Sequence, residues 1–232
     1  MESIKMFIGF DQVESVAYYV FENSIQRNTS IPVAITPIRL SQLKNVLVRP
    51  RHPLQSNEFA FSRWLVPYLC DYKGWAIFAD CDMLCRSDLK ELWDLRDDKY
   101  SVMVVKHNHK PKETVKYLDT AQLPYERKNW SSVMMFNCAK CKTLTPEYVN
   151  TASGLDLHQF KWLPGEEDIG TLPREWNHLV GYDDPTHKVK IAHFTIGGPY
   201  FNEFYGCEFS EEWMSEYRLM THCEQRSKVQ QA

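Results

Sequence analysis

The sequence lacks several features that would assign it to a class at once. No apolar run approaches the roughly 18 residues of a membrane-spanning helix. The start, MESIKMFIGFD, has neither the basic segment nor the apolar stretch of a secretory signal. With 27 Lys and Arg interspersed among 30 Asp and Glu, there is no basic signature of a nucleic-acid-binding protein. Repeats, low-complexity segments and Gly/Ser-rich linkers are missing too. We therefore expect a cytoplasmic protein with no nucleic-acid partner and no transmembrane segment.

The cysteines allow two interpretations. Seven cysteines at irregular spacing do not suggest a disulfide framework, and reduced cysteines behave as small buried hydrophobic residues. Cys81 and Cys85, and then Cys138 and Cys141, form two close pairs that could bind zinc. A zinc site therefore stays open as an alternative.

What the chain does contain is an alternation of apolar and amphipathic segments. Short apolar runs predict strands at residues 4–10, 32–40, 75–79, 100–107, 131–137 and 189–195. Spacing and capping residues predict helices at 13–27, at 59–72 on both sides of Pro67, at 88–95 with Ser87 as N-cap, from about 146, and within 208–226. Such alternation predicts an α/β fold whose mixed, mostly parallel central sheet is flanked by helices, with a further helix at the C-terminus.

Two aspartates, Asp80 and Asp82, directly follow the apolar run at 75–79. Residues two apart in extended chain face the same way, so both carboxylates can approach one hard divalent cation. Ligands of open α/β sheets bind beyond the carboxyl ends of the strands, which is where this pair lies. About one such pair is expected by chance in a chain of this size, so a metal site and a simple strand end are equally open at this point.

Other residues suit the same chemistry but also have ordinary explanations. His193 ends an apolar run and would be a good third ligand, although a lone histidine is more often a core residue. Gly197 and Gly198 would let backbone approach a phosphate, or simply form a turn. Arg63 suits a diphosphate or a solvated helix edge. The acidic turn 166–168 could hold sugar hydroxyls or be an exposed loop.

The order of these segments carries more information than any one of them. FIGFD, FSRWLVPYL, AIFADCDMLCRSDLKELWDL, NWSSVMMFN, EEDIG and HFT followed by GG and P occur in sequence over roughly residues 4–205. In this order they resemble the retaining glycosyltransferases of family 8, the GT-A-fold enzymes that include glycogenin and bacterial galactosyltransferases. The resemblance implies one GT-A-type domain over residues 1–232, with a core at about 4–205 and a C-terminal helical extension at 206–232.

The resemblance also implies an activity. It is the transfer of a hexose from a UDP-sugar to an acceptor hydroxyl on a glycan, a lipid-linked sugar or a protein, with retention of configuration and with Mn²⁺ or Mg²⁺. The metal ligands would be Asp80, Asp82 and His193. Contacts to the donor would come from Phe10, Asp11, Arg63, Asp80, Cys81, Asp82, Ser131, Ser132, Gly197 and Gly198, with Cys81 as a spacer between the two aspartates. Arg63, Glu167 and Asp168 would serve catalysis, with Glu167 as a candidate nucleophile and same-face attack as the alternative.

Two departures from the family pattern affect the expected donor site. Trp130, Ser131 and Ser132 stand where the family usually reads Asn-x-Gly, and GGPYF lacks the lysine that often follows the histidine. A sugar-nucleotide nucleotidyltransferase would need a Gly-rich phosphate loop with a basic residue, and GFDQVESVAYY offers neither. A non-catalytic nucleotide-sugar or zinc-binding interaction protein stays open as a second alternative.

Overall fold

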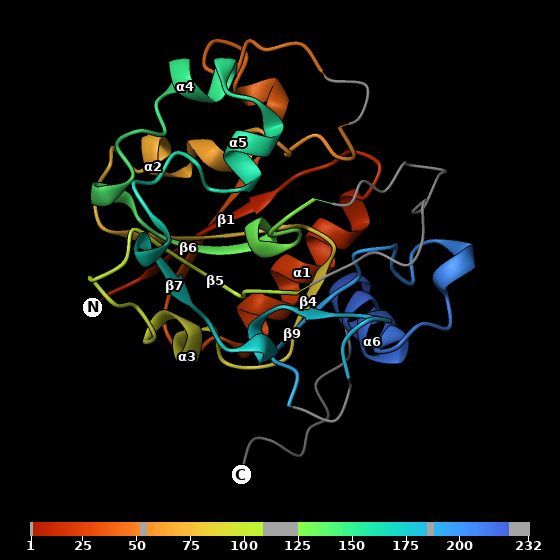
Figure 1. The fold of residues 1–232 in the computed structure, drawn as a ribbon. Coiled ribbons are helices and arrows are strands. Elements are labelled where there is room, and N and C mark those ends of the chain that lie inside the picture. The colour runs from red at the N-terminus through yellow and green to blue at the C-terminus, as the bar shows by residue number, and fades with distance from the viewer. Residues whose placement is uncertain (1, 52–54, 109–124, 185–187, 223–232) are drawn as a thin grey trace.

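The computed structural model of the protein describes residues 2–51, 55–108, 125–184 and 188–222. A six-stranded sheet in the order β2-β1-β3-β6-β5-β7 forms its centre (Figure 1). Its strands are β1 (Ile4–Gly9), β2 (Val33–Ile38), β3 (Trp75–Ala79), β5 (Val102–Val104), β6 (Val133–Asn137) and β7 (Ile169–Thr171). Strand β1 pairs in parallel with β2 and β3, and β5 in parallel with β7, whereas β6 is antiparallel to both β3 and β5. The predicted mixed α/β sheet is confirmed.

A smaller sheet lies beside the central one. It has the order β4-β9-β8 and consists of β4 (Met83–Cys85), β8 (His178–Leu179) and β9 (Ile191–His193). Strand β4 is antiparallel to β9, which is parallel to β8. Only residues 80–82 separate β3 from β4, so the chain crosses from one sheet to the other within the Asp-Cys-Asp tripeptide.

Helices cover the sheets on both sides. They are α1 (Ser15–Asn28), α2 (Val66–Leu69), α3 (Leu89–Trp93), α4 (Pro146–Thr151), α5 (Gly154–His158) and α6 (Ser210–Thr221). Helices α2, α4 and α5 lie on one side of the central sheet, and α1 and α3 lie on the other (Figure 1). In the part of the chain that the structure describes, none of the helices is long and apolar enough to cross a membrane.

Helix α1 joins the two sheets to the C-terminal helix. Its buried side chains are Ala17, Tyr18, Val20, Phe21, Ser24 and Ile25. The Ser24 hydroxyl accepts a hydrogen bond from the backbone N–H of Cys85 in β4 at 3.0 Å. On α6, Trp213 is buried in an apolar cluster with Val20, and Glu216 accepts hydrogen bonds from Asn23 and Arg27. The predicted C-terminal helix that packs on the main body is thus confirmed.

Three local predictions differ from the structure. The helix predicted at 13–27 begins only at Ser15, so Val13 precedes it and is 59% exposed. The cap of α3 is Asp88 rather than Ser87, since the Asp88 carboxylate accepts from the N–H of Lys90. Residues 59–72 do not form one helix. Because Pro67 has no N–H and suits a first turn, α2 begins at Val66, after a separate 3₁₀ turn.

The close approach of Gly9 and Phe59 generates a stability prediction. A Cβ at Gly9, the last residue of β1, would lie 2.3 Å from Cγ of the Phe59 ring. Because overpacking a filled core strains it, we expect Gly9→Ala to lower the free energy of unfolding by about 1–3 kcal/mol. Gly206→Ala, where nothing lies within 4 Å of the added Cβ, should change it by less than about 0.5 kcal/mol. Denaturant unfolding measures both, and equal stability of the two variants would contradict the prediction.

Candidate functional site

A cavity of about 600 Å³ opens beyond the carboxyl ends of β1 and β3. Six of the residues singled out from the sequence line it: Arg63, Asp80, Asp82, Ser131, Ser132 and His193. Its wall also includes residues that the sequence did not mark, among them Glu14, Tyr125, Lys128, His158 and Thr195. The cavity therefore collects polar and charged groups from distant parts of the chain.

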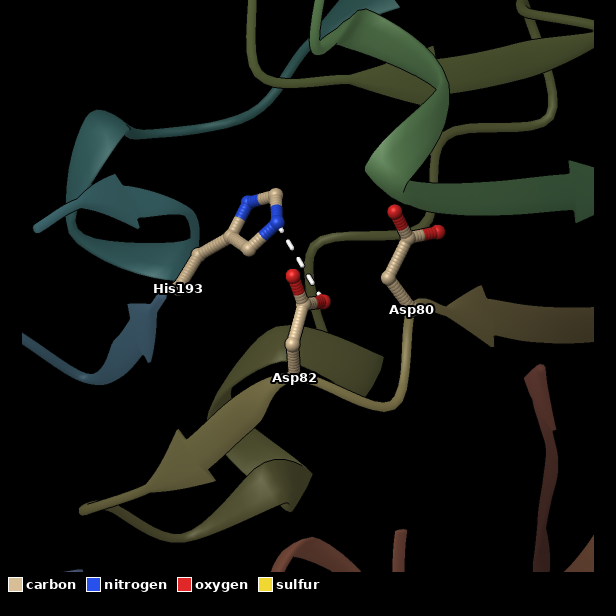
Figure 2. Close-up of side chains that lie close together, drawn as sticks. All are labelled: Asp80, Asp82 and His193. Carbon is tan, nitrogen blue, oxygen red and sulfur yellow. Dashed lines mark ion pairs between the residues drawn. The ribbon is translucent and has the colours of Figure 1, made fainter. Parts of the chain in front are cut away.

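Asp80, Asp82 and His193 converge on one side of this cavity (Figure 2). One ligand atom from each lies within 4.8 Å of the others, and His193 Nε2 lies 3.4 Å from Asp82 Oδ1. The strand register produces this proximity, because Met83 pairs with His193 across β4 and β9. The backbone N–H of Phe194 also donates to the carbonyl of Asp82 at 2.8 Å.

The three side chains fit a divalent cation. Two carboxylates and one imidazole suit Mn²⁺ or Mg²⁺, which prefer oxygen ligands, and Mn²⁺ also accepts a nitrogen. Ligand atoms lie about 2 Å from such an ion, so any two are at most about 4 Å apart. Small side-chain rotations would bring these three atoms onto one ion.

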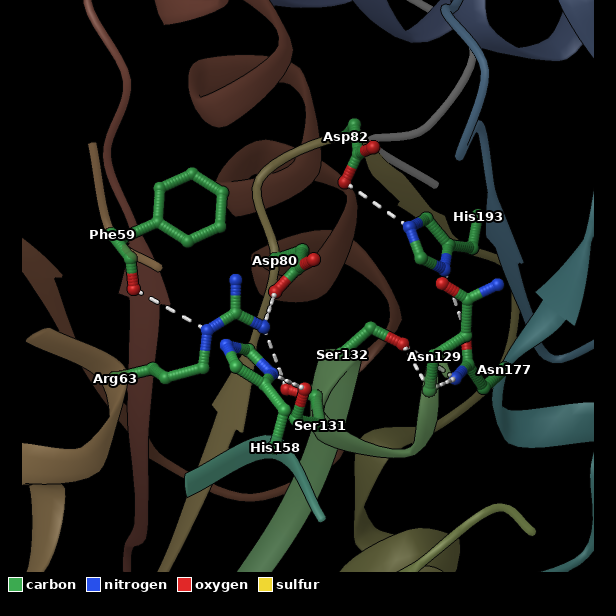
Figure 3. Close-up of polar contacts among 10 residues, drawn as sticks. All are labelled: Phe59, Arg63, Asp80, Asp82, Asn129, Ser131, Ser132, His158, Asn177 and His193. Carbon is green, nitrogen blue, oxygen red and sulfur yellow. Dashed lines mark hydrogen bonds and ion pairs between the residues drawn. The ribbon is translucent and has the colours of Figure 1, made fainter. Parts of the chain in front are cut away.

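Arg63 compensates the charge of Asp80 (Figure 3). Its Nη1 donates to Asp80 Oδ1 and to the carbonyl of Ser131, both at 2.8 Å, and its Nε donates to the carbonyl of Phe59 at 3.3 Å. The guanidinium carbon also lies 5.0 Å from the centroid of the Phe78 ring. Since both members of the ion pair are buried and hydrogen-bonded, Arg63 holds the Asp80 carboxylate in one orientation.

A second series of hydrogen bonds connects His193 to the turn that precedes β6 (Figure 3). His193 Nδ1 lies 2.9 Å from Oδ1 of Asn177, which is fully buried. Asn177 Nδ2 donates to Ser132 Oγ at 2.8 Å and to the carbonyl of Asn129 at 3.2 Å. The Ser132 hydroxyl in turn donates to that same carbonyl at 2.6 Å. Nothing in the stretch REWNHL marks Asn177, so the sequence could not reveal it.

Ser131 has a different partner. Its hydroxyl lies 2.7 Å from Nδ1 of His158, at the end of α5. Burial, together with the positive charges of Arg63 and Lys128, lowers the pKa of His158 to about 3, while a hydrogen bond with the Ala60 backbone opposes this effect. The imidazole is therefore neutral, and the direction of its hydrogen bond with Ser131 depends on the tautomer. In either tautomer Ser131 Oγ keeps a lone pair that can accept a hydrogen bond from a ligand.

Phe10 and Asp11, two of the predicted donor contacts, do not line the cavity. Both carboxylate oxygens of Asp11 accept backbone N–H groups, from Val13 and Glu58, each at 2.9 Å. The ring of Phe10 is covered by the guanidinium of Arg39, 3.6 Å from the ring centroid. Asp11 therefore fixes the local backbone.

Three further predicted donor contacts also lie off the cavity wall. Cys81 is fully buried between the two aspartates, and burial raises the pKa of its thiol. Gly197, at φ +134°, and Gly198 pack closely against the rings of Phe204 and Tyr200. Tyr200 donates its hydroxyl to Glu14 at 2.6 Å, which connects this turn to the cavity.

The cysteine pairs do not form a zinc site within the described residues. Among these residues, one group of three potential metal-ligating side chains lies close together, and it consists of Asp80, Asp82 and His193. Cys138 and Cys141 are buried at the end of β6, where their thiols contact backbone carbonyls. They serve as core residues.

The acidic turn Glu166–Asp168 is not brought to the metal triad. It precedes β7, whose first residue, Ile169, pairs with Val102 at the start of β5. Because β5 is antiparallel to β6, this point lies level with the end of β6, whereas the aspartate pair lies level with its beginning. Asp168 accepts from the Ser101 hydroxyl at 3.0 Å, and neither it nor Glu167 lines the cavity. Their contact with the donor sugar stays a prediction of the sequence.

Comparison with known proteins adds a close relative and a fold. No family model matches the sequence. Protein CDI of Arabidopsis thaliana is 49% identical over 221 residues, which cover 91% of this chain and 85% of that protein.

Solved structures share the fold at low identity. The bifunctional glycosyltransferase WbbM has a TM-score of 0.66 and 16% identity over 93% of this chain, which spans only 49% of WbbM. The galactosyltransferase LgtC, in complex with donor and acceptor sugar analogs, has a TM-score of 0.61 and 11% identity, with 96% of this chain and 98% of LgtC covered. GlyE of Streptococcus pneumoniae TIGR4 has a TM-score of 0.59 and 14% identity, with 94% and 62% covered. The GT-A-type fold that the sequence implied is confirmed.

The low pKa of His158 predicts a pH-dependent stability. The folded protein keeps this imidazole neutral down to about pH 3, whereas the unfolded chain takes up the proton below about pH 6.5. The contribution of the buried neutral imidazole to the free energy of unfolding is therefore complete above pH 6.5. It falls by up to about 1.4 kcal/mol per pH unit as the pH falls toward 3. In His158→Gln the side chain still offers a hydrogen-bond acceptor and a hydrogen-bond donor, but it has no titratable group.

Denaturant unfolding at several pH values between 4 and 7 tests this. The stability of the wild type relative to His158→Gln should decline steadily below pH 6.5. Two parallel curves would show that burial of His158 carries no such linkage.

Proposed function

The chain belongs to the family of Protein CDI of Arabidopsis thaliana, and we propose that this member is a metal-dependent glycosyltransferase. It would move a hexose from a UDP-sugar to an acceptor hydroxyl with retention of configuration. The observation that carries the proposal is the convergence of Asp80, Asp82 and His193 on the wall of a large cavity in a GT-A-type fold. One domain over residues 1–232 and a cytoplasmic location stay predictions of the sequence.

The cation would be Mn²⁺ or Mg²⁺, held by the two aspartates and the histidine. When bound, it would neutralise the negative charge that develops on the departing diphosphate. Arg63 keeps Asp80 turned toward this position through the buried ion pair. The β4–β9 register holds Asp82 beside His193. The protein would thus present a pre-oriented ligand set before the donor arrives.

Ser131 and its surroundings would recognise the donor sugar. The Ser131 hydroxyl is hydrogen-bonded to His158, and its oxygen keeps a lone pair that can accept a hydrogen bond from a sugar hydroxyl. Tyr125 and Lys128 line the same cavity and supply donors for further oxygens. Burial raises the pKa of Tyr125 to about 12, so its hydroxyl keeps its proton at neutral pH.

The carboxylates near the cavity favour same-face attack by the acceptor. Among the described residues that line the cavity, carboxylates come from Glu14, Asp80 and Asp82. The two aspartates are committed to the metal, and Glu14 is buried and accepts the Tyr200 hydroxyl. None of them is placed as a nucleophile for a covalent intermediate. Glu167 is assigned no step, because its segment lies off the cavity. Acceptors remain a glycan, a lipid-linked sugar or a protein hydroxyl.

Asp82→Asn tests the proposal. The substitution removes one negative metal ligand while it keeps the shape of the side chain, so we expect Mn²⁺-dependent hydrolysis of the preferred UDP-sugar to fall by at least about 10²-fold. Metal-dependent UDP binding should fall with it. UDP release from a panel of UDP-sugars, with and without Mn²⁺, measures the activity, and calorimetry measures UDP binding.

Asp94→Asn is the matched control, since Asp94 forms an exposed i, i+4 ion pair of little energetic weight. It should leave hydrolysis unchanged. Full activity of Asp82→Asn would remove the metal assignment. Formation of a UDP-sugar from UTP and a sugar phosphate would instead favour the nucleotidyltransferase, and stoichiometric zinc without any hydrolysis would favour a binding protein.

A further inference from the structure

We propose that Asn177 is a positioning residue, which selects the tautomer of His193 that can bind the metal. The inference rests on the proposed metal-dependent function, but its central claim concerns the protein without metal. Asn177 follows the 3₁₀ turn Arg174–Trp176 and is fully buried between His193 and the turn that precedes β6. It does not itself line the cavity, but its hydrogen-bond partners Asn129, Ser132 and His193 do.

The orientation of the Asn177 amide follows from its second partner. Nδ2 lies 3.2 Å from the backbone carbonyl of Asn129. A carbonyl oxygen can only accept a hydrogen bond, so the NH₂ end of the amide must face Asn129. A flipped amide would set two oxygens against each other in a buried site. The carbonyl end of Asn177 therefore faces His193, with Oδ1 2.9 Å from Nδ1.

This orientation determines the proton position on His193. Because Oδ1 of Asn177 can only accept, Nδ1 of His193 must carry the proton. In a neutral imidazole the other nitrogen, Nε2, then has the free lone pair. Nε2 is the nitrogen that lies 3.4 Å from Asp82 Oδ1, on the side where the ligand atoms converge. A metal ligand whose second nitrogen donates to a protein oxygen is fixed both in tautomer and in ring orientation.

The same amide also ties His193 to Asp80. Asn177 Nδ2 donates to the Ser132 hydroxyl at 2.8 Å, and the Ser132 carbonyl accepts the backbone N–H of Asp80 at 2.9 Å. The short turn Trp130–Ser132 thus contacts Asp80 directly and His193 through Asn177. Only a side chain with a donor and an acceptor in one plane satisfies His193 and Asn129 together. Aspartate would keep the acceptor toward His193 but lose the donor toward Asn129.

The first test reads the tautomer directly. Long-range ¹⁵N–¹H NMR of protein labelled on histidine, without metal and at neutral pH, distinguishes Nδ1-protonated from Nε2-protonated and charged rings. The His193 signal is assigned from its absence in His193→Gln. We expect Nδ1 of His193 to carry a proton in the wild type and to lose this preference in Asn177→Leu. A wild-type ring protonated at Nε2 alone, or an unchanged ring in Asn177→Leu, overturns the proposal.

The second test uses Mn²⁺ alone as the probe, with its free fraction measured by electron paramagnetic resonance. Asn177→Leu should weaken Mn²⁺ binding by about 10–100-fold. Asn177→Asp should recover most of that loss, because it restores an acceptor for Nδ1. Asn28→Leu is the matched control: Asn28 donates to the carbonyls of Ser24 and Cys85, so it loses a comparable pair of hydrogen bonds elsewhere.

Thermal unfolding of each variant separates positioning from folding. If Asn177→Leu and Asn28→Leu lose similar stability but only Asn177→Leu loses Mn²⁺ affinity, the positioning role is supported. Equal Mn²⁺ affinity of these two variants overturns it. Should the wild type bind no Mn²⁺ at all, the proposed function fails, and the tautomer measurement still decides the role of Asn177.

Discussion

The burial of several carboxylates beside one cavity is the constraint on which the rest of this structure depends. An ionised carboxylate costs several kcal/mol to bury unless other groups compensate its charge or satisfy its oxygens. Most of the compensating groups come from a distant part of the chain. The pairs are Asp80 with Arg63, Glu14 with Tyr200, and Asp11 with the backbone N–H groups of Val13 and Glu58. Apolar burial supplies most of the folding free energy, but these polar contacts determine how the elements around the cavity are placed.

The two aspartates are held by different sheets, which explains why their geometry is well defined. The backbone N–H of Asp80 continues the ladder of the central sheet by donating to Ser132, whereas the carbonyl of Asp82 accepts from Phe194 and begins the ladder of the smaller sheet. The separation of the carboxylates is therefore set by how the two sheets meet, and Cys81 fills the buried position between them. A side chain larger than cysteine there would push the sheets apart, because the site offers no exposed space.

Local patterns in the sequence were enough to find the centre of the site but not its surroundings. The apolar run before Asp80 and Asp82, and the strand that ends at His193, have signals that lie within a few residues. Asn177 and His158 have none, since each matters only through a partner 16 or 27 residues away that the fold brings close. The acidic turn is a different case, because strand direction decides the end of the sheet at which a segment lies. The antiparallel insertion of β6 places residues before β7 away from the cavity.

The charges around the triad also imply an order of events under the proposed function. Asp80 and Asp82 bring two formal negative charges, of which Arg63 compensates one. Together these three side chains are negative and would repel a diphosphate. A divalent cation reverses the sign, and the same wall then attracts the diphosphate. Because Arg63 is already engaged with Asp80 and with two backbone carbonyls, it cannot turn away to substitute for the cation without leaving a buried carboxylate uncompensated. Under the proposed function, donor binding would therefore depend on the metal, and the ion pair that stabilises the site would also prevent the protein from working without it.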